Sequence, residues 1–361
     1  MKMKVILTGG GTGGSVTPLI AVAQNLESRY QNEIEFLWLG TNNGPEKKLA
    51  SRYNIKFIAI PAGKWRRYFS WQNCLDIFKI IAGFICSFFI IIFYQPKVIA
   101  SAGSFVSVPV AWAAWLLRKP FLIHQQDVVP GLANKLMTPF AEIVTVALDK
   151  SLNDFPPQKV KYVGNPYRQE ILNGSREKAF NFFKLEKNLP VILVIGGGTG
   201  SEFMNHLIIE ALPELTTFAQ VIHLSGEDKN QELRVTNYEL NRYQQYSFLQ
   251  EELKDAYAAA DLVITRAGMG VLTELSILGK PSIIIPIPDS HQEANADYFA
   301  GRSAAIVLPQ NNLTPQILIE KIKDLITQKE KLLLYQEKIK TIMPTDATQK
   351  LADIIYDYRN K

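Results

Sequence analysis

The sequence is poor in the residues that build metal sites and disulfides. Only two cysteines occur, Cys74 and Cys86, and their spacing fits neither a disulfide framework nor a zinc pair. The four histidines are scattered, with no cysteine or histidine partner at ligand spacing. No Asp-x-Asp pair is present, which argues against a metal-diphosphate site built on neighbouring aspartates. We therefore expect a protein of a reducing compartment that uses no metal or other cofactor.

Strong charge of one sign is also absent. The net charge is +5 and charged residues make up 20% of the chain, without the basic stripe typical of nucleic-acid binding. With 361 residues, 47% of them hydrophobic, the chain has the composition of a globular protein and the length of two domains. We expect no nucleic-acid partner and some preference for anionic surfaces or phosphates.

Two common nucleotide-binding fingerprints are missing. Gly14 is followed by Ser15 and no lysine, which disfavours a Walker-type ATP site. The second expected strand ends at Leu39 and continues as Gly-Thr-Asn-Asn, without an acid for a ribose, which disfavours NAD. The first strand is expected to begin within four residues of Met1, which leaves no room for a signal peptide and indicates a cytoplasmic protein.

What the sequence does contain is two glycine-rich turns, each between an apolar run and a helix-like stretch. Residues 5–8 run into Gly-Gly-Gly-Thr-Gly-Gly-Ser at 9–15, and residues 191–195 run into Gly-Gly-Gly-Thr-Gly-Ser at 196–201. Such a turn aims backbone N–H groups and the positive end of a helix at an anion. Two of them, each opening one half of the chain, predict two nucleotide-binding-type domains.

Short Val/Ile-rich runs alternate with helical stretches through both halves. Continuous apolar runs indicate strands buried on both faces, hence parallel sheets covered by helices. The expected fold is α/β, with two doubly wound Rossmann-like domains facing across a cleft, divided near residues 164–166. The candidate strands are residues 5–8, 35–39, 56–60, 97–100, 120–124, 143–147 and 160–163, then 191–195, 220–224, 262–265, 282–286 and 305–308.

Residues 80–94 form a run of fifteen without a charge. A membrane span needs about twenty residues, so we expect a core helix with one lipid-facing side. The preceding Trp65, Arg66, Arg67 and Trp71 are typical of a helix seated at the headgroup layer.

Small and polar residues follow several strands at the edge where parallel sheets bind ligands. Residues 268–274 form another glycine bend before a helix, where Glu274 could hold a sugar diol or only interact with the helix dipole. Gln292 and Asn295 share a helix face and could bind ligand hydroxyls or cap the helix. His124 is a core histidine or a functional one.

In their order along the chain, these loops resemble those of the MurG-type glycosyltransferases. These GT-B enzymes transfer N-acetylglucosamine from UDP-N-acetylglucosamine to lipid I, forming lipid II for peptidoglycan. The resemblance covers essentially the whole chain. It rests on GGTGG at 10–14, FVSVP at 105–109, GNPYR at 164–168, GGGTG at 196–200 with Asn205, YAAAD at 257–261, RAGMGVLTE at 266–274 and HQEANA at 291–296.

The resemblance implies an inverting, metal-independent transferase that is peripheral on the cytoplasmic face of the membrane. Its partners would be a UDP-sugar, a polyprenyl-diphosphate-linked acceptor and an anionic membrane surface. Residues 1–165, with a C-terminal helix at 346–361 packing back on them, would form the acceptor and membrane side, and residues 166–345 would bind the UDP-sugar. Glu274 would hold the ribose diol and Gln292 the sugar hydroxyls. The implied donor contacts are Thr12, Gly13, Gly14, Asp127, Arg168, Gly198, Gln250, Met269, Gly270, Val271, Leu272, Thr273, Glu274 and Gln292.

The chain departs from the family pattern mainly on the acceptor side. Ser15 stands where the family has a histidine, and Asp127 ends a His-Gln-Gln-Asp segment in place of His-Glu-Gln-Asn. Asp127 is therefore the candidate base, with Ser15 at the position of the family histidine. Two alternatives stay open: a related transferase with another lipid or glycan acceptor, and a non-catalytic paralogue that binds nucleotide sugar. The oligomeric state does not follow from the sequence.

Overall fold

The computed structural model describes residues 2–63, 71–198, 200–226 and 242–360, with no side-chain detail for residues 71–75. The chain divides into two compact units. The first comprises Met1–Arg168 and Pro344–Lys361, and the second Gln169–Met343.

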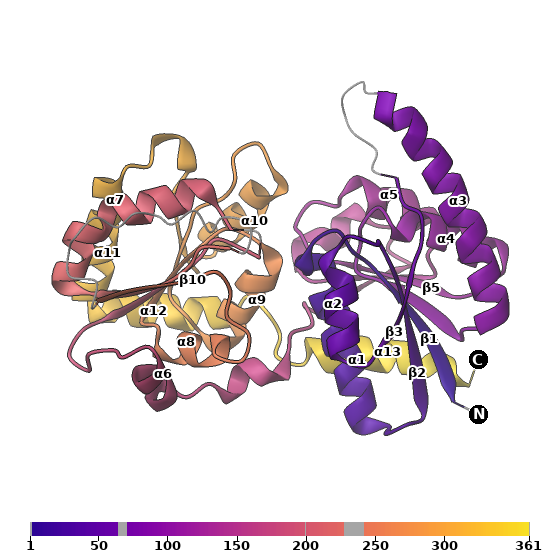
Figure 1. Ribbon diagram of the computed structural model, residues 1–361, viewed down its shortest axis with the longest axis horizontal. Coiled ribbons are helices and arrows are strands. Elements are labelled where there is room, and N and C mark those ends of the chain that lie inside the picture. Colours follow the sequence, from indigo (N-terminus) through magenta and orange to yellow (C-terminus); the bar gives the residue numbers. More distant parts are fainter. Residues whose placement is uncertain (1, 64–70, 199, 227–241, 361) are drawn as a thin grey trace. The chain divides into compact units, whose positions relative to one another are not determined.

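The first unit is built on a seven-stranded parallel sheet in the order β3-β2-β1-β4-β5-β6-β7 (Figure 1). This order, in which the chain winds outward from the central strand in both directions, is that of a doubly wound fold. The strands are β1 (Met3–Thr8), β2 (Ile34–Gly40), β3 (Lys56–Ala59), β4 (Val98–Ser101), β5 (Phe121–Gln125), β6 (Ile143–Val146) and β7 (Val160–Tyr162).

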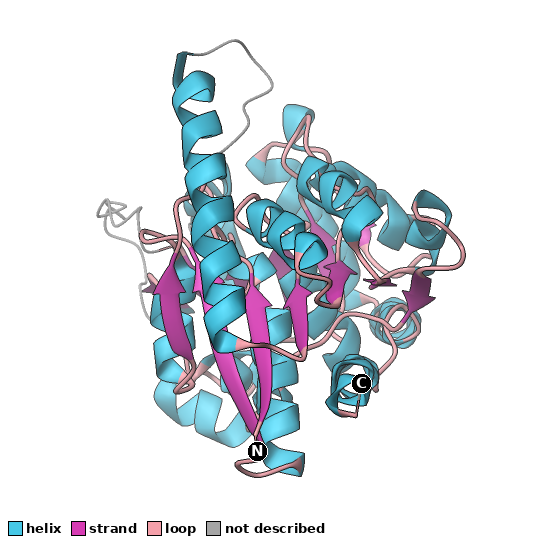
Figure 2. Cartoon of the chain, turned by 90° about the vertical axis from the view of Figure 1, so that its right-hand side faces the viewer, coloured by secondary structure: helices cyan, strands magenta, loops and turns pink. Residues whose placement is uncertain are grey.

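Helices cover both faces of this sheet (Figure 2). Buried side chains of α1 and α13 form one core with β1 and β2, and those of α4 form another on the opposite face. The C-terminal α13 thus belongs to the first unit, where the Arg29 guanidinium on α1 lies 2.7 Å from the Asp353 carboxylate. The helices are α1 (Thr17–Arg29), α2 (Pro45–Arg52), α3 (Trp71–Tyr94), α4 (Ser107–Leu116), α5 (Leu132–Met137) and α13 (Ala347–Tyr356).

The apolar helix α3 differs from expectation. Only 17% of residues 76–94 is buried, so the expected core helix is wrong for most of its surface. One edge, including Ser87 and Ile91, packs inward against the neighbouring α4. By length and a mean hydropathy of 2.4 the segment could cross a membrane, a test that a soluble core helix also passes. Its first turns extend past the carboxyl ends of the strands (Figures 1 and 2).

The second unit contains a six-stranded parallel sheet in the order β10-β9-β8-β11-β12-β13. Two such doubly wound sheets confirm the predicted α/β class. Every expected strand is present, and β10 is an addition that the sequence reasoning missed because Tyr-Gln-Gln-Tyr is polar and lies at the sheet edge. The strands are β8 (Val191–Ile195), β9 (Gln220–Leu224), β10 (Tyr243–Tyr246), β11 (Leu262–Thr265), β12 (Ser282–Ile284) and β13 (Ile306–Val307).

A buried core in this unit joins α7 and α11 to β8, β9 and β11. The five side chains of β8, Val-Ile-Leu-Val-Ile, are all buried, as expected of a central parallel strand. The helices of the unit are α6 (Arg176–Phe182), α7 (Glu202–Phe218), α8 (Leu253–Ala259), α9 (Met269–Leu278), α10 (His291–Ala300), α11 (Pro315–Thr327) and α12 (Lys329–Lys340).

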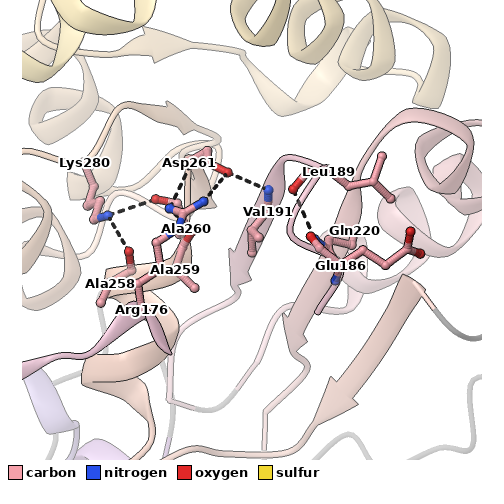
Figure 3. Close-up of polar contacts among 10 residues, drawn as sticks. All are labelled: Arg176, Glu186, Leu189, Val191, Gln220, Ala258, Ala259, Ala260, Asp261 and Lys280. Carbon is pink, nitrogen blue, oxygen red and sulfur yellow. Dashed lines mark hydrogen bonds and ion pairs between the residues drawn. The ribbon is translucent and has the colours of Figure 1, made fainter. Parts of the chain in front are cut away.

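A polar cluster fixes the amino-terminal edge of the second sheet (Figure 3). The Asp261 carboxylate accepts the N–H of Val191 at 2.8 Å and lies 3.1 Å from the Arg176 guanidinium. The Lys280 ammonium donates to the carbonyl of Ala260 at 2.9 Å, at the end of α8, where carbonyls lack helical partners. Burial lowers the pKa of Lys280 to about 8. This edge is structural, and the opposite edge carries the loops of interest.

Candidate functional site

A cavity of about 370 Å³ lies at the carboxyl edge of the second sheet, where the loops after β8, β11 and β12 meet. The second glycine-rich turn and the amino-terminal starts of α7 and α9 contribute to its wall. Two helix N-termini at one cavity favour an anion by their dipoles and N–H groups. Its lining comprises Gly196, Gly197, Gly200, Ser201, Glu202, Phe203, Thr265, Arg266, Gly268, Val271, Ile287, Gln292 and Gln310.

Arg266 brings a buried positive charge to this cavity. Its Nε and Nη2 donate to the Ser201 hydroxyl at 3.0 and 2.6 Å, and Nη1 donates to the carbonyls of Ile285 and Pro286 at 3.0 and 3.2 Å. Burial lowers the pKa of Arg266 to about 10, so the group stays protonated at neutral pH. All four bonds go to uncharged acceptors, which leaves the guanidinium charge available to an anionic ligand.

Two amides of α10 hold the turn that carries Arg266. The side-chain oxygen of Gln292 accepts the N–H groups of Ala267 and Ile287, both at 3.2 Å, and the Asn295 amide donates to the Ala267 carbonyl at 3.1 Å. Asn295 is fully buried, and its amide holds this turn, so it neither reaches a ligand nor caps α10, whose N-cap is Ser290. Gln292 lines the cavity with its oxygen engaged, and its NH2 group is the part that can donate to ligand hydroxyls.

Glu274 lies on the partly exposed face of α9, one turn after Val271 in the cavity wall. The fully buried Tyr257 on α8 donates its hydroxyl to the Glu274 carboxylate at 2.9 Å. A carboxylate fixed at one oxygen in this way can still accept two hydroxyl hydrogens from a sugar diol.

The other expected donor contacts of the second unit differ in accessibility. Met269, Leu272 and Thr273 point into the core and could reach a ligand only through their backbone, whereas Gly270 and Val271 are partly exposed. Gly198 is exposed in the second glycine-rich turn but is not among the residues that line the cavity. Gln250 is exposed and lines a separate, more open hollow of about 450 Å³ just before α8.

In the first unit, the loop of residues 9–15 follows β1 at the carboxyl edge of its own sheet. Thr12 and Gly14 are exposed, and Gly13 partly so. The buried Ser15 hydroxyl donates to the carbonyls of Gly10 and Thr12, at 3.0 and 3.2 Å. Ser15, which stands at the position of the family histidine, therefore closes the loop on itself through its hydroxyl.

His124 lies in β5, and Asp127 lies in the loop that follows this strand. His124 is buried and both ring nitrogens are hydrogen-bonded, Nδ1 to Thr145 at 3.0 Å and Nε2 to Asn165 at 2.8 Å. Burial lowers its pKa to about 4, so it is neutral at pH 7 and serves as a core histidine. Asp127 is half-buried, and its carbonyl accepts the Gln125 amide at 2.7 Å, which fixes the backbone beside the carboxylate.

Arg168 closes the Gly-Asn-Pro-Tyr-Arg segment at the end of the first unit. Gly164 adopts φ +85°, and a Cβ there would lie 2.3 Å from a ring atom of Pro344, so only glycine fits. The N–H of Tyr167 donates to the Thr348 hydroxyl at 3.0 Å, which ties this segment to α13. The half-buried Arg168 is thereby held on a rigid backbone.

No group of three or more His, Cys, Asp or Glu side chains that could hold a metal ion occurs among the described residues. The polar groups that line the cavity are a guanidinium, helix N-termini, two amides, two hydroxyls and the carboxylate of Glu202.

Comparisons with known proteins place this arrangement in a family. The glycosyltransferase family 28 N-terminal domain matches residues 5–146, and the C-terminal domain of that family matches residues 191–357. The UDP-N-acetylglucosamine--N-acetylmuramyl-(pentapeptide) pyrophosphoryl-undecaprenol N-acetylglucosamine transferase of Clostridium kluyveri is 37% identical over 99% of both chains. The chain belongs to glycosyltransferase family 28. A transferase of the same name from Legionella pneumophila is 37% identical over 98% of this chain and 97% of its own.

Solved structures agree with this family 28 assignment. The crystal structure of MurG from Acinetobacter baumannii has 25% identity and a TM-score of 0.75, covering 98% of this chain and 99% of that one. The UDP-GlcNAc 2-epimerase of Neisseria meningitidis, solved with UDP-GlcNAc, has 15% identity and a TM-score of 0.68, covering 99% and 100%. The second likeness concerns the fold alone. Together they confirm the expected GT-B fold.

Sequence reasoning recognised Arg266 only as the start of a motif and missed it as a site residue. Phe203, whose ring centre lies 5.7 Å from the Arg266 guanidinium carbon, and Gln310 from a distant loop were also missed. The position of Arg266 directly after β11 was a usable signal, because that edge of a parallel sheet binds ligands. Nothing local marks Gln310.

Proposed function

We propose that this chain transfers N-acetylglucosamine from UDP-N-acetylglucosamine to a polyprenyl-diphosphate-linked N-acetylmuramyl pentapeptide, the reaction that gives its relatives their name. One observation carries the donor half of this proposal. The cavity of the second unit combines the buried Arg266 charge with two helix N-termini, a combination suited to a nucleotide diphosphate.

The cavity and the turn of α9 that follows Val271 in its wall offer groups for the rest of the donor. Glu274 holds the ribose diol, Gln292 donates its NH2 to the sugar hydroxyls, and the backbone of residues 269–273 lies against the nucleotide. Gly198 and Gln250 stay proposals from the resemblance, since both lie outside the cavity lining.

Transfer breaks the bond between the anomeric carbon and the diphosphate as an acceptor hydroxyl attacks from the opposite face. The UDP leaves with the electron pair of the broken bond, and Arg266 and the helix N-termini offset its charge without a metal. The hydroxyl proton needs a base, and in the first unit we assign Asp127 to that role. Thr12, Gly13, Gly14 and Arg168 remain proposed donor contacts of that unit.

We propose that the first unit binds the membrane peripherally through α3. Ile77, Ile81, Ile85, Phe89 and Phe93 follow one another at intervals of four residues and are all exposed. On a helix this spacing gives one continuous apolar stripe. Phe78 beside it is 70% exposed and Phe93 79%. The amino-terminal end of α3 extends past the sheet edge that carries the loop of residues 9–15 and Asp127 (Figures 1 and 2), so a lipid-linked acceptor would meet the first part of the stripe beside that edge.

The expected basic anchor for this surface, Trp65, Arg66 and Arg67, lies outside the described residues, and Trp71 is placed only as the first residue of α3. Co-sedimentation with anionic and neutral vesicles tests the surface. Phe78→Ser/Phe93→Ser should lose binding, Arg66→Glu/Arg67→Glu should lose the preference for anionic vesicles, and Leu333→Ser, exposed on α12 of the second unit, should change neither. Unchanged binding of the phenylalanine variant would exclude α3.

The function itself is tested with radiolabelled UDP-sugars and a panel of acceptors. We expect transfer from UDP-N-acetylglucosamine to lipid I, and none to plain polyprenyl diphosphate or to unrelated glycolipids. Transfer to another acceptor alone would replace the acceptor half of the proposal. UDP binding without transfer to any acceptor would indicate a non-catalytic protein.

A further inference from the structure

A fully buried carboxylate lies under the first glycine-rich turn. Glu46 is in the first turn of α2, has no exposed surface, and takes no part in the proposed chemistry. Its side chain crosses from α2 to the loop of residues 9–15, which follows β1. A buried carboxylate is costly unless its oxygens are satisfied, so its contacts indicate what it does.

Three donors point at the Glu46 oxygens. The N–H of Gly11 donates to Oε2 at 3.1 Å, while the N–H and the hydroxyl of Thr41 donate to Oε1 at 2.7 and 2.5 Å. Because all three partners donate, the ionised carboxylate, which only accepts, is the form that fits. Its place at the start of α2 adds a favourable interaction with the helix dipole.

The surrounding backbone is shaped around this carboxylate. A Cβ at Gly10, Gly40 or Gly44 would lie 2.2, 2.7 or 2.0 Å from a Glu46 side-chain atom. Since Glu46 is enclosed on all sides, it has no room to move away from such a Cβ. Glycines at these positions therefore make room for the carboxylate.

The rest of the turn is fixed by β2 and by the loop after β4. The Trp38 indole N–H on β2 donates to the Gly9 carbonyl at 3.0 Å, and the Ser104 hydroxyl donates to the Gly10 carbonyl at 2.7 Å. Both of these hydrogen bonds restrain carbonyl oxygens of the turn. Glu46 supplies the complementary contact, which holds the N–H of Gly11, whose φ is +81°.

The two glycine-rich turns are thus opposite in charge despite their similar sequences. The second turn lies beside the Arg266 cation, and its cavity suits a ligand anion. In the first turn, an anion that belongs to the protein already occupies the Gly11 N–H. A phosphate that binds this N–H would have to displace the Glu46 carboxylate, which is hydrogen-bonded both to the loop between β2 and α2 and to the first glycine-rich turn.

We infer that Glu46 is a positioning residue that acts as an internal anion in the first glycine-rich turn. By holding Gly11, it sets the conformation of Thr12, Gly13 and Gly14. The effect of this conformation on catalysis rests on the proposed function. The first turn then takes part in transfer through its exposed residues Thr12–Gly14, and the diphosphate of the ligand binds at the second turn.

Glu46→Gln tests this inference, because the amide keeps the shape but replaces an acceptor oxygen with an NH2 group that faces a donor. We expect kcat for transfer to fall at least about tenfold, as misplacement of a binding loop does, while the Kd for UDP changes less than about twofold. Hydrogen exchange should rise in the peptide covering residues 9–15 and stay unchanged in residues 196–201. The exchange measurement needs no turnover, so it still decides the positioning role if the wild-type protein proves inactive.

Two further variants complete the experiment. Thr41→Val removes one of the three bonds and should lower kcat less than Glu46→Gln does, which keeps the inference testable if the latter fails to fold. Glu35→Gln, on β2 with its carboxylate 2.8 Å from the exposed Lys56 ammonium, is the matched control and should leave kcat and exchange unchanged. The inference would be overturned if folded Glu46→Gln showed the kcat and the hydrogen exchange of the wild type. If only Thr41→Val folds, the same result in that variant would overturn it. Loss of UDP affinity together with raised exchange in residues 196–201 would also overturn it, since the two together indicate general destabilisation.

Discussion

The contact between Tyr257 and Glu274 gives the most direct test of the donor site. The Tyr257 hydroxyl donates to the Glu274 carboxylate at 2.9 Å, and the tyrosine is fully buried, so it restrains the carboxylate before a ligand arrives. Tyr257→Phe removes the hydroxyl and leaves the ring packing in place. UDP would then have to order Glu274 itself, which costs about 0.5–1.5 kcal/mol for one flexible side chain.

That cost corresponds to an affinity for UDP about 2- to 13-fold weaker in Tyr257→Phe. Glu274→Ala removes the charge-assisted bond to the diol, worth about 1.5–3 kcal/mol, and should weaken UDP binding about 13- to 160-fold. If Tyr257 acts through Glu274, the double variant binds UDP no more weakly than Glu274→Ala alone.

Isothermal titration calorimetry with UDP on the four proteins of this cycle measures both quantities. Tyr243→Phe is the matched control, since the hydroxyl of this buried tyrosine of the same unit is hydrogen-bonded to His223 Nδ1 at 3.0 Å and to Gln245 at 3.3 Å, away from the cavity lining. Additive losses in the double variant would refute the positioning of Glu274 by Tyr257. Unchanged UDP affinity in Glu274→Ala would remove Glu274 from the site.

Three further outcomes are expected. Asp127→Asn should lower kcat about 10²–10⁴-fold with UDP affinity little changed, whereas wild-type kcat in this variant would make Asp127 a binding residue only. Transfer should survive excess EDTA, and activity that disappears with the chelator and returns with Mg²⁺ would contradict the metal-free stabilisation of the leaving diphosphate. The third concerns Lys280, whose pKa falls from 10.5 to about 8 in the folded chain. The unfolded state therefore binds more protons between these values, and the free energy of unfolding should rise with pH there by up to about 1.4 kcal/mol per unit. Denaturant titrations between about pH 8 and 10 should show this rise in the wild type but not in Lys280→Met, and equal slopes would contradict it.

The fold could be predicted from the sequence because its signals are local. Runs such as residues 191–195, apolar without alternation, are compatible only with burial on both faces of a sheet, and glycine turns followed by helices fix the βα units. Gln292 and Glu274 became candidates for the same reason, since each lies shortly after a strand end, and their roles toward the donor stay predictions.

Composition alone did not decide which side of an apolar helix is covered. Residues 80–94 are equally apolar whether α3 is a core helix or a surface helix. Only the tertiary structure shows that α3 packs against α4 along one side and leaves most of its surface exposed. The polar β10 was missed for a related reason, because an edge strand needs little apolar surface.

Tertiary structure alone decided the contacts that distinguish the two glycine-rich turns. Glu46 meets Gly11 across 35 positions, and Arg266 meets Ser201 across 65, through hydrogen bonds that no periodicity encodes. A glycine-rich sequence specifies a bend with exposed N–H groups, and the charge placed beside that bend depends on which distant side chain the sheet order brings there. The sequence thus determined that two turns with N–H groups suited to an anion exist. The tertiary structure placed the Glu46 carboxylate at the first turn and the Arg266 cation at the second.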